Sequence, residues 1–485
     1  MYDQIYRKIQ TRFPPEQAIA ERTFKWVLCS PYPLTSEELL SAARMAIEKD
    51  DIKLASCVQQ DPLLSICENL LMVDTYGRWR FFHLSAREYL EKALGIYQKA
   101  HSYCAQVCLL SLMRTFGPKT LRGSSEDPFN ETHPFSYHAQ TWWAFYAHEQ
   151  PQPEEDQSVI LLKKFIGSPN KSSAIYIRWL DHIKKHSLSF QWPSRAGPFM
   201  SHEDLAPSTT PMFAIAQFLL YETTLRKWCD SNDFDPFQQN DRGEGLLTIA
   251  ATTNCIPLCA TLIAKGVPVN QCNANGKYGS VLAAAANCGR LDTVKYLVQE
   301  AKADVNLPLQ SGDYGSALNA AVFNGSLDIV KYFAEEVPDV NLLVHVEIHG
   351  NVLAAAAFSG KLDIVRYLVE EANIDVNLPP GEGQVFGSVL CAAAWGTLDI
   401  VKYLVEEAKA VVNVPSAVGN GFVAADLCGD LDIVRYFVEE AKADVDLLRD
   451  DEFLSMALED YTKEDAVAVR HILKLPSDQG TGDEH

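Results

Sequence analysis

The chain has 485 residues, 47% of them apolar and 22% charged, so it is long enough to bury more than one hydrophobic core. Its net charge of −21 is concentrated in one half: residues 241–485 hold 17 Lys and Arg against 36 Asp and Glu, whereas residues 1–240 hold 25 against 27. An acidic half of this kind would repel a phosphate backbone, so we expect no nucleic acid among its partners. No run approaches the roughly 18 apolar residues of a membrane span, so no membrane partner is expected either.

The cysteines indicate the compartment. Twelve cysteines contain no Cys-x-x-Cys pair, and most of them lie inside helical patterns. Thiols of this kind are typical of small buried apolar residues in a reducing compartment. The opening segment, MYDQIYRKIQTRF, lacks the apolar stretch of a signal peptide. We therefore expect a cytoplasmic location.

Residues 1–95 are predicted to form a compact helical module with one hairpin. The periodicity and the proline breaks predict helices over Tyr2–Phe13, Gln17–Ser30, Thr35 or Ser36 through Ala46, Leu63–Asn69, and from Ser85 onward. The segments LLMVD and RWRFFHL flank a turn at Tyr76-Gly77, which predicts a hairpin. Three helices followed by a hairpin outline a winged helix. Few basic residues lie on its third helix and wing, which favours protein packing over DNA binding.

Several motifs of residues 1–150 resemble a known family. YDQIYRKI, FKWVLCSPYPLTSEELLSAA, LLSICENLLMVD and FFHLSAREYL resemble the winged-helix segment that follows the NACHT nucleotide-binding module in fungal NLR-like (STAND) proteins. QKAHSYCAQVCLLSLM and HPFSYHAQTWWAFYAH resemble the helical region after it. The resemblance implies ankyrin repeats toward the end of the chain and a NACHT-containing chain as a partner. In this family the NACHT module, with its phosphate-binding loop, precedes the winged helix, and we expect no counterpart of it within residues 1–485, so no residue here is expected to hydrolyse nucleotide.

Residues 96–206 are predicted to form a helical region and a connector, with helices around Val159–Ile166 and Ser173–Ser187. Gly167–Ser172 lacks the length of a phosphate-binding loop and the glycine before its lysine, so we predict a turn there. Histidines are concentrated in this region: His101, His133, His138, His148, His182, His186 and His202. They motivate an alternative hypothesis, an enzyme with its site in residues 96–206, although no nucleophile, zinc or kinase signature accompanies them.

Residues 207–475 contain a repeated unit. The repeated stretch occurs as Gly289–Asn306, Gly325–Asn341, Gly360–Asn377, Gly396–Asn413 and Gly429–Asp446. The first glycines are 36, 35, 36 and 33 residues apart, the period of a supersecondary unit. Four copies follow a segment of small residues that begins at Ser280, Ser316, Asn351 or Ser388, side chains suited to cap a short helix. Each unit thus predicts a short helix, a turn at glycine, a longer helix and a loop, and stacking on the next unit would bury its apolar face.

The repeated unit resembles the ankyrin repeat through Gly-x-Leu-Asp-x-Val-Lys and Asp-Val-Asn. Thr210-Pro-Met-Phe-Ala is similar to the opening of such a repeat, so two weaker units are expected ahead of the clear ones. We therefore predict a mainly α fold, in which a winged-helix and helical N-terminal region is followed by an ankyrin-repeat α-solenoid of about eight units including caps. Glu452–Lys474 is expected to form a polar cap, and residues 476–485 a disordered tail.

Two sets of side chains recur on the predicted units. Basic and acidic residues are spaced to pair at i and i+4 on the second helices, as in Lys331/Glu335, Arg366/Glu370, Lys402/Glu406 and Arg435/Glu439. Aromatic residues and one histidine recur at matching positions and are our candidates for binding a partner: Tyr278, Tyr314, His349, Phe386, Phe323, Phe358 and Trp395. The alternative, left open here, is that these rings pack one unit against the next. A tyrosine found in every copy, such as Tyr367, is expected to be structural.

The sequence therefore predicts a non-enzymatic regulatory protein without catalytic residues, cofactor or metal. Its solenoid would recognise a protein partner, while its N-terminal part would dock on a NACHT-type switch. A truncated relic of a NACHT–ankyrin protein is a further alternative that the residues do not separate from a working regulator.

Overall fold

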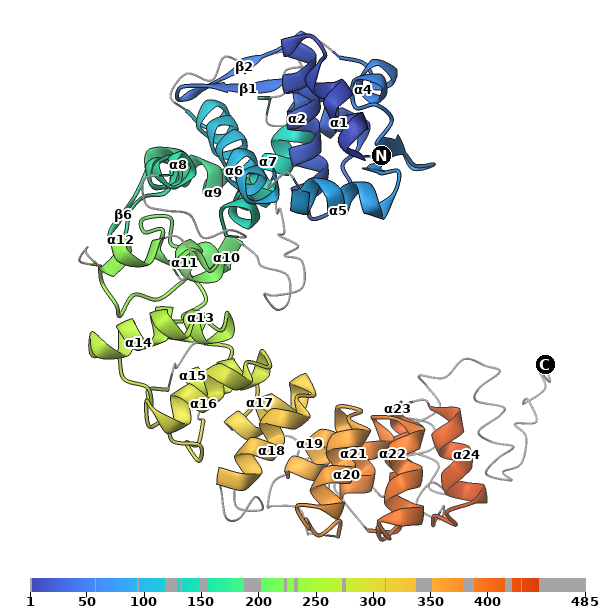
Figure 1. The fold of residues 1–485 in the computed structure, drawn as a ribbon. Helices are drawn as coiled ribbons and strands as arrows, with labels where there is room; N and C mark the ends of the chain where they lie inside the picture. Colours follow the sequence, from blue (N-terminus) through green and yellow to red (C-terminus); the bar gives the residue numbers. More distant parts are fainter. Residues whose placement is uncertain are drawn as a thin grey trace, which may run out of the picture. The chain divides into compact units, whose positions relative to one another are not determined.

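The computed structural model describes residues 2–56, 58–93, 96–117, 129–130, 133–148, 156–186, 202–221, 225–230, 234–272, 276–309, 311–336, 351–377, 388–414, 421–428 and 430–444. The chain divides between Val267 and Pro268 into two compact units (Figure 1). Each unit is described by itself below. The predicted cap at Glu452–Lys474 and the tail at 476–485 lie outside the described residues.

The first unit begins with the predicted winged helix. Its helices are α1 (Tyr2–Gln10), α2 (Pro14–Cys29), α3 (Ser36–Arg44), α4 (Gln60–Ile66) and α5 (Leu84–Ala93), and β3 (Leu71–Val73) pairs antiparallel with β4 (Trp79–Phe81) (Figure 1). The first turn of α2 accommodates Pro14-Pro15, since that turn has no intrahelical partner for its N–H groups. A capping box starts α3: Thr35 Oγ1 accepts from the Glu38 N–H at 3.3 Å, and the Glu38 carboxylate accepts from the Thr35 N–H at 2.8 Å.

The end of α3 differs from the prediction. The helix ends at Arg44 and does not continue through Ala46, because Met45–Glu48 forms a strand, β1, that pairs with β2 (Asp51–Leu54). Lys49 adopts a left-handed conformation (φ 57°) in the turn between the strands. The second strand buries Ile52. A run as short as Met-Ala-Ile-Glu fits a helix end or a strand equally well, and the tertiary pairing decides between them.

Four helices follow the winged helix in the same unit: α6 (Ile96–Thr115), α7 (Pro134–His148), α8 (Gln157–Ile166) and α9 (Ala174–Lys185). Trp143 on α7 lies at the centre of their aromatic core, with its ring centroid 5.1 Å from Phe165, 5.6 Å from Trp179 and 5.4 Å from Phe218. The turn predicted at Gly167–Ser172 is confirmed as the hairpin of β5 (Gly167–Ser168) and β6 (Lys171–Ser172). The unit closes with short helices: α10 (His202–Leu205), α11 (Met212–Gln217), α12 (Arg226–Asp230), α13 (Leu246–Thr252) and α14 (Ile256–Ala264).

The second unit contains the helix pairs expected from the repeats (Figure 1). The first helices are α15 (Val281–Asn287), α17 (Ala317–Asn324), α19 (Val352–Phe358), α21 (Val389–Ala394) and α23 (Gly421–Cys428). The second helices are α16 (Leu291–Gln299), α18 (Leu327–Glu336), α20 (Leu362–Glu370), α22 (Leu398–Lys402) with its π-helical continuation η3 (Tyr403–Glu407), and α24 (Leu431–Glu439). Each first helix contacts the next first helix, and each second helix the next second helix.

The predicted caps of the short helices are confirmed. Ser280, Ser316, Asn351 and Ser388 each accept a hydrogen bond from the backbone N–H three residues later, at distances between 2.8 and 3.2 Å. The Ala-rich first helices are almost fully buried. Their small side chains let backbones approach closely: a Cβ added at Gly396 would lie 2.2 Å from the Ala357 carbonyl oxygen of the preceding repeat.

Contacts between successive second helices replace most of the pairs that we predicted within them. Only Arg366/Glu370 forms at i, i+4 (3.6 Å) among the four pairs predicted on these described helices. Four cations of the second helices lie over the tyrosine ring of the next repeat: Lys295 over Tyr332 at 5.9 Å, Lys331 over Tyr367 at 5.1 Å, Arg366 over Tyr403 at 4.5 Å and Lys402 over Tyr436 at 5.5 Å. A cation over the face of an aromatic ring is attracted by the negative charge of that face.

Asparagine side chains join the loops of successive repeats. Asn377 Oδ1 accepts from the Val411 N–H at 2.8 Å, and its amide nitrogen donates to the Lys409 carbonyl at 3.4 Å. Asn270 makes the same two bonds to Asp304 and Lys302. Asn270 and Asn377 therefore each bridge two successive repeats, and these repeats rely on their neighbours for their loop geometry.

Candidate functional site

The aromatic row, which we define as Tyr278, Tyr314, Phe323, Phe358 and Trp395, lies beside the first helices of the second unit. Phe323 is the penultimate residue of α17, and Phe358 is the last residue of α19. Trp395 is the C-cap residue of α21. Because the first helices contact one another in sequence, these three rings occupy matching places in three successive repeats. His349 and Phe386, the other two candidates, lie outside the described residues.

Exposure changes along the aromatic row. The Tyr278 and Tyr314 rings stack with their centroids 6.4 Å apart, and Tyr314 lies 5.7 Å from Phe323. Tyr314 is buried, whereas Tyr278, Phe323 and Phe358 are half-buried. Trp395 exposes 45% of its surface. The first rings therefore pack unit against unit, which is one of the alternatives that the sequence left open, whereas Trp395 at the far end is exposed to solvent.

The tyrosine found in every repeat is placed differently. Its ring receives the cation of the preceding repeat, and in two repeats its hydroxyl also donates to that repeat's glutamate: Tyr403 to Glu370 and Tyr436 to Glu406, both at 2.9 Å. Burial, together with the bonded Glu370 carboxylate, raises the pKa of Tyr403 to about 12. These contacts support a structural part for the repeated tyrosine.

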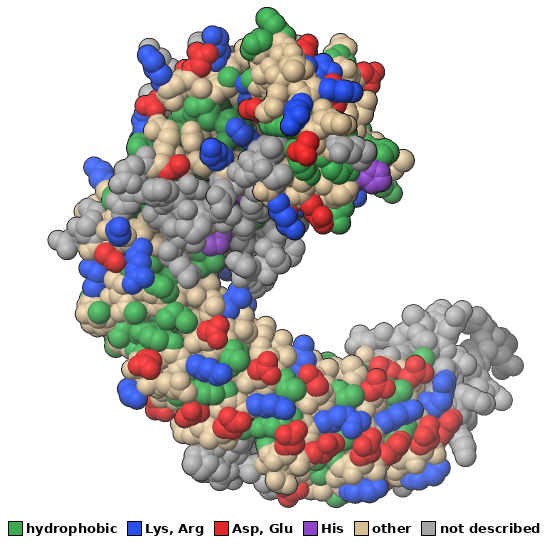
Figure 2. Space-filling model, viewed as in Figure 1, with side chains coloured by type: hydrophobic (Ala, Val, Ile, Leu, Met, Phe, Trp, Pro, Cys, Tyr) green, Lys and Arg blue, Asp and Glu red, His purple; other side chains and the backbone are tan. Residues whose placement is uncertain are grey.

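Basic and acidic side chains lie next to one another along the second helices, as Figure 2 shows over α18 to α24. Two of the ion pairs there join successive repeats: Arg366 with Glu407 at 3.3 Å and Lys331 with Glu371 at 3.9 Å. These side chains are about half exposed, so each pair is worth only about 0.2–1 kcal/mol. The second-helix face is a mixed-charge surface, in contrast to the aromatic row.

The histidines of residues 96–206 do not come together as one group. His101, His133, His138 and His148 are buried, His182 is half-buried and His186 is exposed. The side chain of His202 lies outside the described residues. His182 and His186 stack with centroids 4.1 Å apart. Within the described residues, no group of three or more His, Cys, Asp or Glu side chains is arranged to hold a metal ion.

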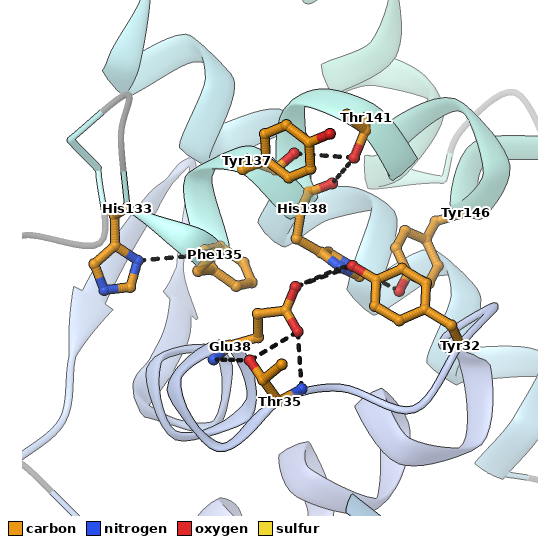
Figure 3. A network of polar contacts seen from close by, with 9 residues as sticks. All are labelled: Tyr32, Thr35, Glu38, His133, Phe135, Tyr137, His138, Thr141 and Tyr146. Carbon is orange, nitrogen blue, oxygen red and sulfur yellow. Dashed lines mark hydrogen bonds and ion pairs between the residues drawn. The ribbon is translucent and has the colours of Figure 1, made fainter. Parts of the chain in front are cut away.

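One histidine, His138 on α7, belongs to a buried polar network (Figure 3). The Tyr32 hydroxyl donates to Glu38 Oε1 at 2.9 Å and lies 3.0 Å from His138 Nδ1. On the other side of the imidazole, Nε2 lies 2.9 Å from the Tyr146 hydroxyl. Since Tyr32 has one proton and gives it to Glu38, Nδ1 carries the imidazole proton and Nε2 accepts from Tyr146.

The imidazole of His138 is sealed from solvent. His138 is completely buried, and burial lowers its pKa to about 3. Burial also raises the pKa of Tyr146 well above its usual range. Trp26 covers the network edge-on, 5.7 Å from His138 and 5.5 Å from Tyr146. A neutral imidazole in this setting fastens α7 to the loop before α3 and has no access to a substrate proton.

Sequence reasoning missed this network because it joins two distant parts of the chain: Tyr32 and His138 are 106 residues apart. In the sequence, Glu38 is one residue of the helix predicted from Thr35 or Ser36 through Ala46, and Tyr32 lies between two prolines. The single available signal was the paired aromatic and histidine pattern of HPFSYHAQTWWAFYAH. That pattern does not show which residues form hydrogen bonds with His138.

Comparisons with known proteins agree with this architecture. Residues 10–99 match the family model described as the GPI inositol-deacylase winged helix domain, and residues 212–309 and 307–380 match the model for ankyrin repeats in three copies. The fold is a winged helix followed by ankyrin repeats. Among solved structures, the human ASB11 ankyrin repeat domain is similar at 20% identity, covering 48% of this chain and 100% of that chain, with a TM-score of 0.38. The search of curated proteins finds no match.

The family models refine the resemblance seen in the sequence. They support a winged helix in the first hundred residues and ankyrin repeats after residue 212. The winged helix that they identify is of the GPI inositol-deacylase type. A link to NACHT-containing proteins is carried by the sequence motifs alone. Among the described helices, none is both long and apolar enough to cross a membrane.

Proposed function

We propose that this chain is a non-enzymatic interaction protein whose ankyrin repeats bind a protein partner through the aromatic row. The observation that carries the proposal is Trp395, a tryptophan 45% exposed at the end of a short helix, in line with Phe323 and Phe358 of the two preceding repeats. Tryptophan is enriched among the residues that carry most of the binding energy of interfaces.

The repeats also give this surface a rigid base. Caps, inter-repeat asparagine bridges and cation–tyrosine contacts hold successive units in register. A rigid scaffold lowers the entropic cost of presenting aromatic side chains to a partner. The variation within the row (Phe, Phe, Trp) fits recognition, since specificity requires differences between repeats, whereas the repeated tyrosine varies nowhere among the copies.

For the N-terminal unit, we propose a docking role on a NACHT-type switch in the cytoplasm. The support for this role is the order of the winged-helix motifs in residues 1–150. The family model over residues 10–99 supports the winged helix itself. An enzymatic role for residues 96–206 is not proposed, because His138, which lies beside a carboxylate and two tyrosines, is fully buried and neutral. A chemical step there would require the core to open.

A quantitative pull-down tests the repeat surface. The full-length chain and the variant Phe323→Ala, Phe358→Ala, Trp395→Ala are immobilised at equal density, and the captured proteins are compared by mass spectrometry. We expect the specific partner to fall by about tenfold or more in the variant, because loss of central aromatic contacts costs about 1.4 kcal/mol or more in total.

The control is a variant with three neutralised glutamates on the second helices: Glu300→Gln, Glu371→Gln, Glu440→Gln. These side chains are exposed and lie at the C-caps of α16, α20 and α24. Circular dichroism and thermal unfolding of each variant show that the folds match. Unchanged recovery with the aromatic variant, or an equal loss with the control, would count against the aromatic row.

A further inference from the structure

A groove of about 420 Å³ lies on the winged helix, far along the chain from the repeats. Leu28, Leu34 and Trp79 form its floor, and each is at most 3% exposed. The Trp79 N–H donates to the Leu34 carbonyl at 2.9 Å, which ties the loop before α3 to β4 and holds the floor together. A volume of this size accommodates one or two large apolar side chains.

The rim of the groove is basic. Arg80 on β4 and Arg87 on α5 both line it, and their side chains are about half exposed. Each guanidinium uses Nε for an ion pair, Arg80 with Asp74 at 3.1 Å and Arg87 with Glu91 at 2.7 Å. Both pairs use the Nε atom, and a guanidinium can hold a second carboxylate with its two terminal nitrogens.

One side of the groove has an apolar residue that is exposed to solvent. Leu84, which lines the groove, exposes 69% of its surface, and its neighbour Phe82 exposes 60%. No acidic side chain is among the described residues that line the groove. An apolar floor, an exposed leucine and two arginines together match a ligand that is apolar in one part and negatively charged in another.

We propose that this groove binds an acidic segment of a partner protein, which inserts a large apolar side chain over Leu28, Leu34 and Trp79 while its carboxylates contact Arg80 and Arg87. A peptide fits better than a polyanion, because Asp and Glu outnumber Lys and Arg even in residues 1–240 and the positive charge is limited to the rim. This site lies outside the repeats and is additional to the function proposed above.

The groove is formed before any ligand arrives. The ring of Tyr32 lines it, and the Tyr32 hydroxyl is fixed by Glu38 at 2.9 Å and by His138 at 3.0 Å. On the floor, Trp79 Nε1 donates to Ser36 Oγ at 3.0 Å. A wall and a floor that are already held by hydrogen bonds lose little conformational entropy on binding.

Fluorescence anisotropy of the full-length chain with short labelled peptides tests the proposal. The probe peptide alternates glutamate with leucine around a central phenylalanine; two comparison peptides replace every glutamate by glutamine, or the phenylalanine by alanine. Single charge reversals Arg80→Glu and Arg87→Glu are compared with Arg78→Glu, an exposed arginine of the same hairpin that does not line the groove. Leu84→Glu is a second variant, at an exposed position where the fold is expected to tolerate charge.

The acidic peptide is expected to bind the intact chain and the Arg78→Glu variant alike. Arg80→Glu, Arg87→Glu and Leu84→Glu each weaken it by about tenfold or more, and both comparison peptides bind more weakly than the probe. The proposal is overturned if no acidic peptide binds, if the glutamine peptide binds as tightly, or if Arg78→Glu loses as much affinity as Arg80→Glu. Tighter binding of phosphatidylserine vesicles or single-stranded RNA than of the peptide overturns it too, since the ligand class would then be different.

Discussion

Replacing the bridging asparagine, Asn377→Ala, should loosen one interface between repeats without disturbing the others. The substitution removes the acceptor for the Val411 N–H (2.8 Å) and the donor to the Lys409 carbonyl (3.4 Å). The net contribution of an intramolecular hydrogen bond to the free energy of unfolding is about 0.5–1.5 kcal/mol, and we expect the longer of these two bonds to contribute least. We expect the free energy of local opening to fall by about 1 kcal/mol, which is roughly a fivefold faster hydrogen exchange.

Hydrogen exchange with mass spectrometry measures this effect by segment. The amides of α22, η3 and the loop through residue 414 should exchange faster in the variant, while those of α15 and α16 keep their rates. This localisation follows because a stacked repeat contacts only its neighbours. Asn377→Asp is the matched control: it keeps the side-chain oxygen that accepts from Val411 and loses only the weaker bond, so its effect should be smaller.

An unchanged exchange rate in α22 and η3, or an equal acceleration in α15, would refute this reasoning. The first result would mean that the asparagine bridge contributes nothing to the interface. The second would mean that the repeats unfold as one block, so that contacts between neighbours do not set local stability.

Two further predictions concern the core. Gly396→Ala places a Cβ 2.2 Å from the Ala357 carbonyl oxygen and should destabilise its repeat by about 1–3 kcal/mol in urea unfolding, whereas Gly245→Ala, whose Cβ meets nothing within 4 Å, should cost less. Burial lowers the pKa of His138 to about 3 and that of His101 to about 4, whereas the pKa of a histidine in the unfolded chain is about 6.5. Below pH 6.5 the unfolded state therefore binds more protons than the folded state. Each histidine therefore removes stability as the pH falls from about 6.5 toward its folded pKa, by up to about 1.4 kcal/mol per pH unit, and His138→Gln should flatten that slope in urea midpoints measured between pH 7 and pH 4. The same dependence of stability on pH in His138→Gln and the intact chain would contradict the second prediction. Equal destabilisation by Gly396→Ala and Gly245→Ala would contradict the first.

Much of the repeat architecture follows from the sequence, because its physics is local. The cap at Ser316, the glycine turn at Gly325 and the apolar face of the following helix lie within a few residues of one another, and the period exposes the same signals repeatedly. The wrong part was the pairing within second helices: Lys331 was expected to meet Glu335, but it lies over Tyr367 of the next repeat. Contacts between repeats depend on how closely the helices of neighbouring repeats pack. The length of the sequence repeat does not give this distance.

The candidate sites were less accessible to sequence reasoning. The aromatic row was found from matching positions, but periodicity could not show that Tyr314 is buried while Trp395 is exposed. The groove on the winged helix was missed because its floor joins Leu28, Leu34 and Trp79 across a helix, a loop and a strand. Long-range packing of this kind leaves no spacing signal in the chain.

The most direct test of the central claim is the affinity of the captured partner for the full-length chain, measured by isothermal titration calorimetry with and without Phe323→Ala, Phe358→Ala, Trp395→Ala. If the repeats bind through the aromatic row, the dissociation constant rises by about tenfold or more in the variant, while the Glu300→Gln, Glu371→Gln, Glu440→Gln control binds like the intact chain. Equal dissociation constants for the intact chain and the aromatic variant would contradict the account.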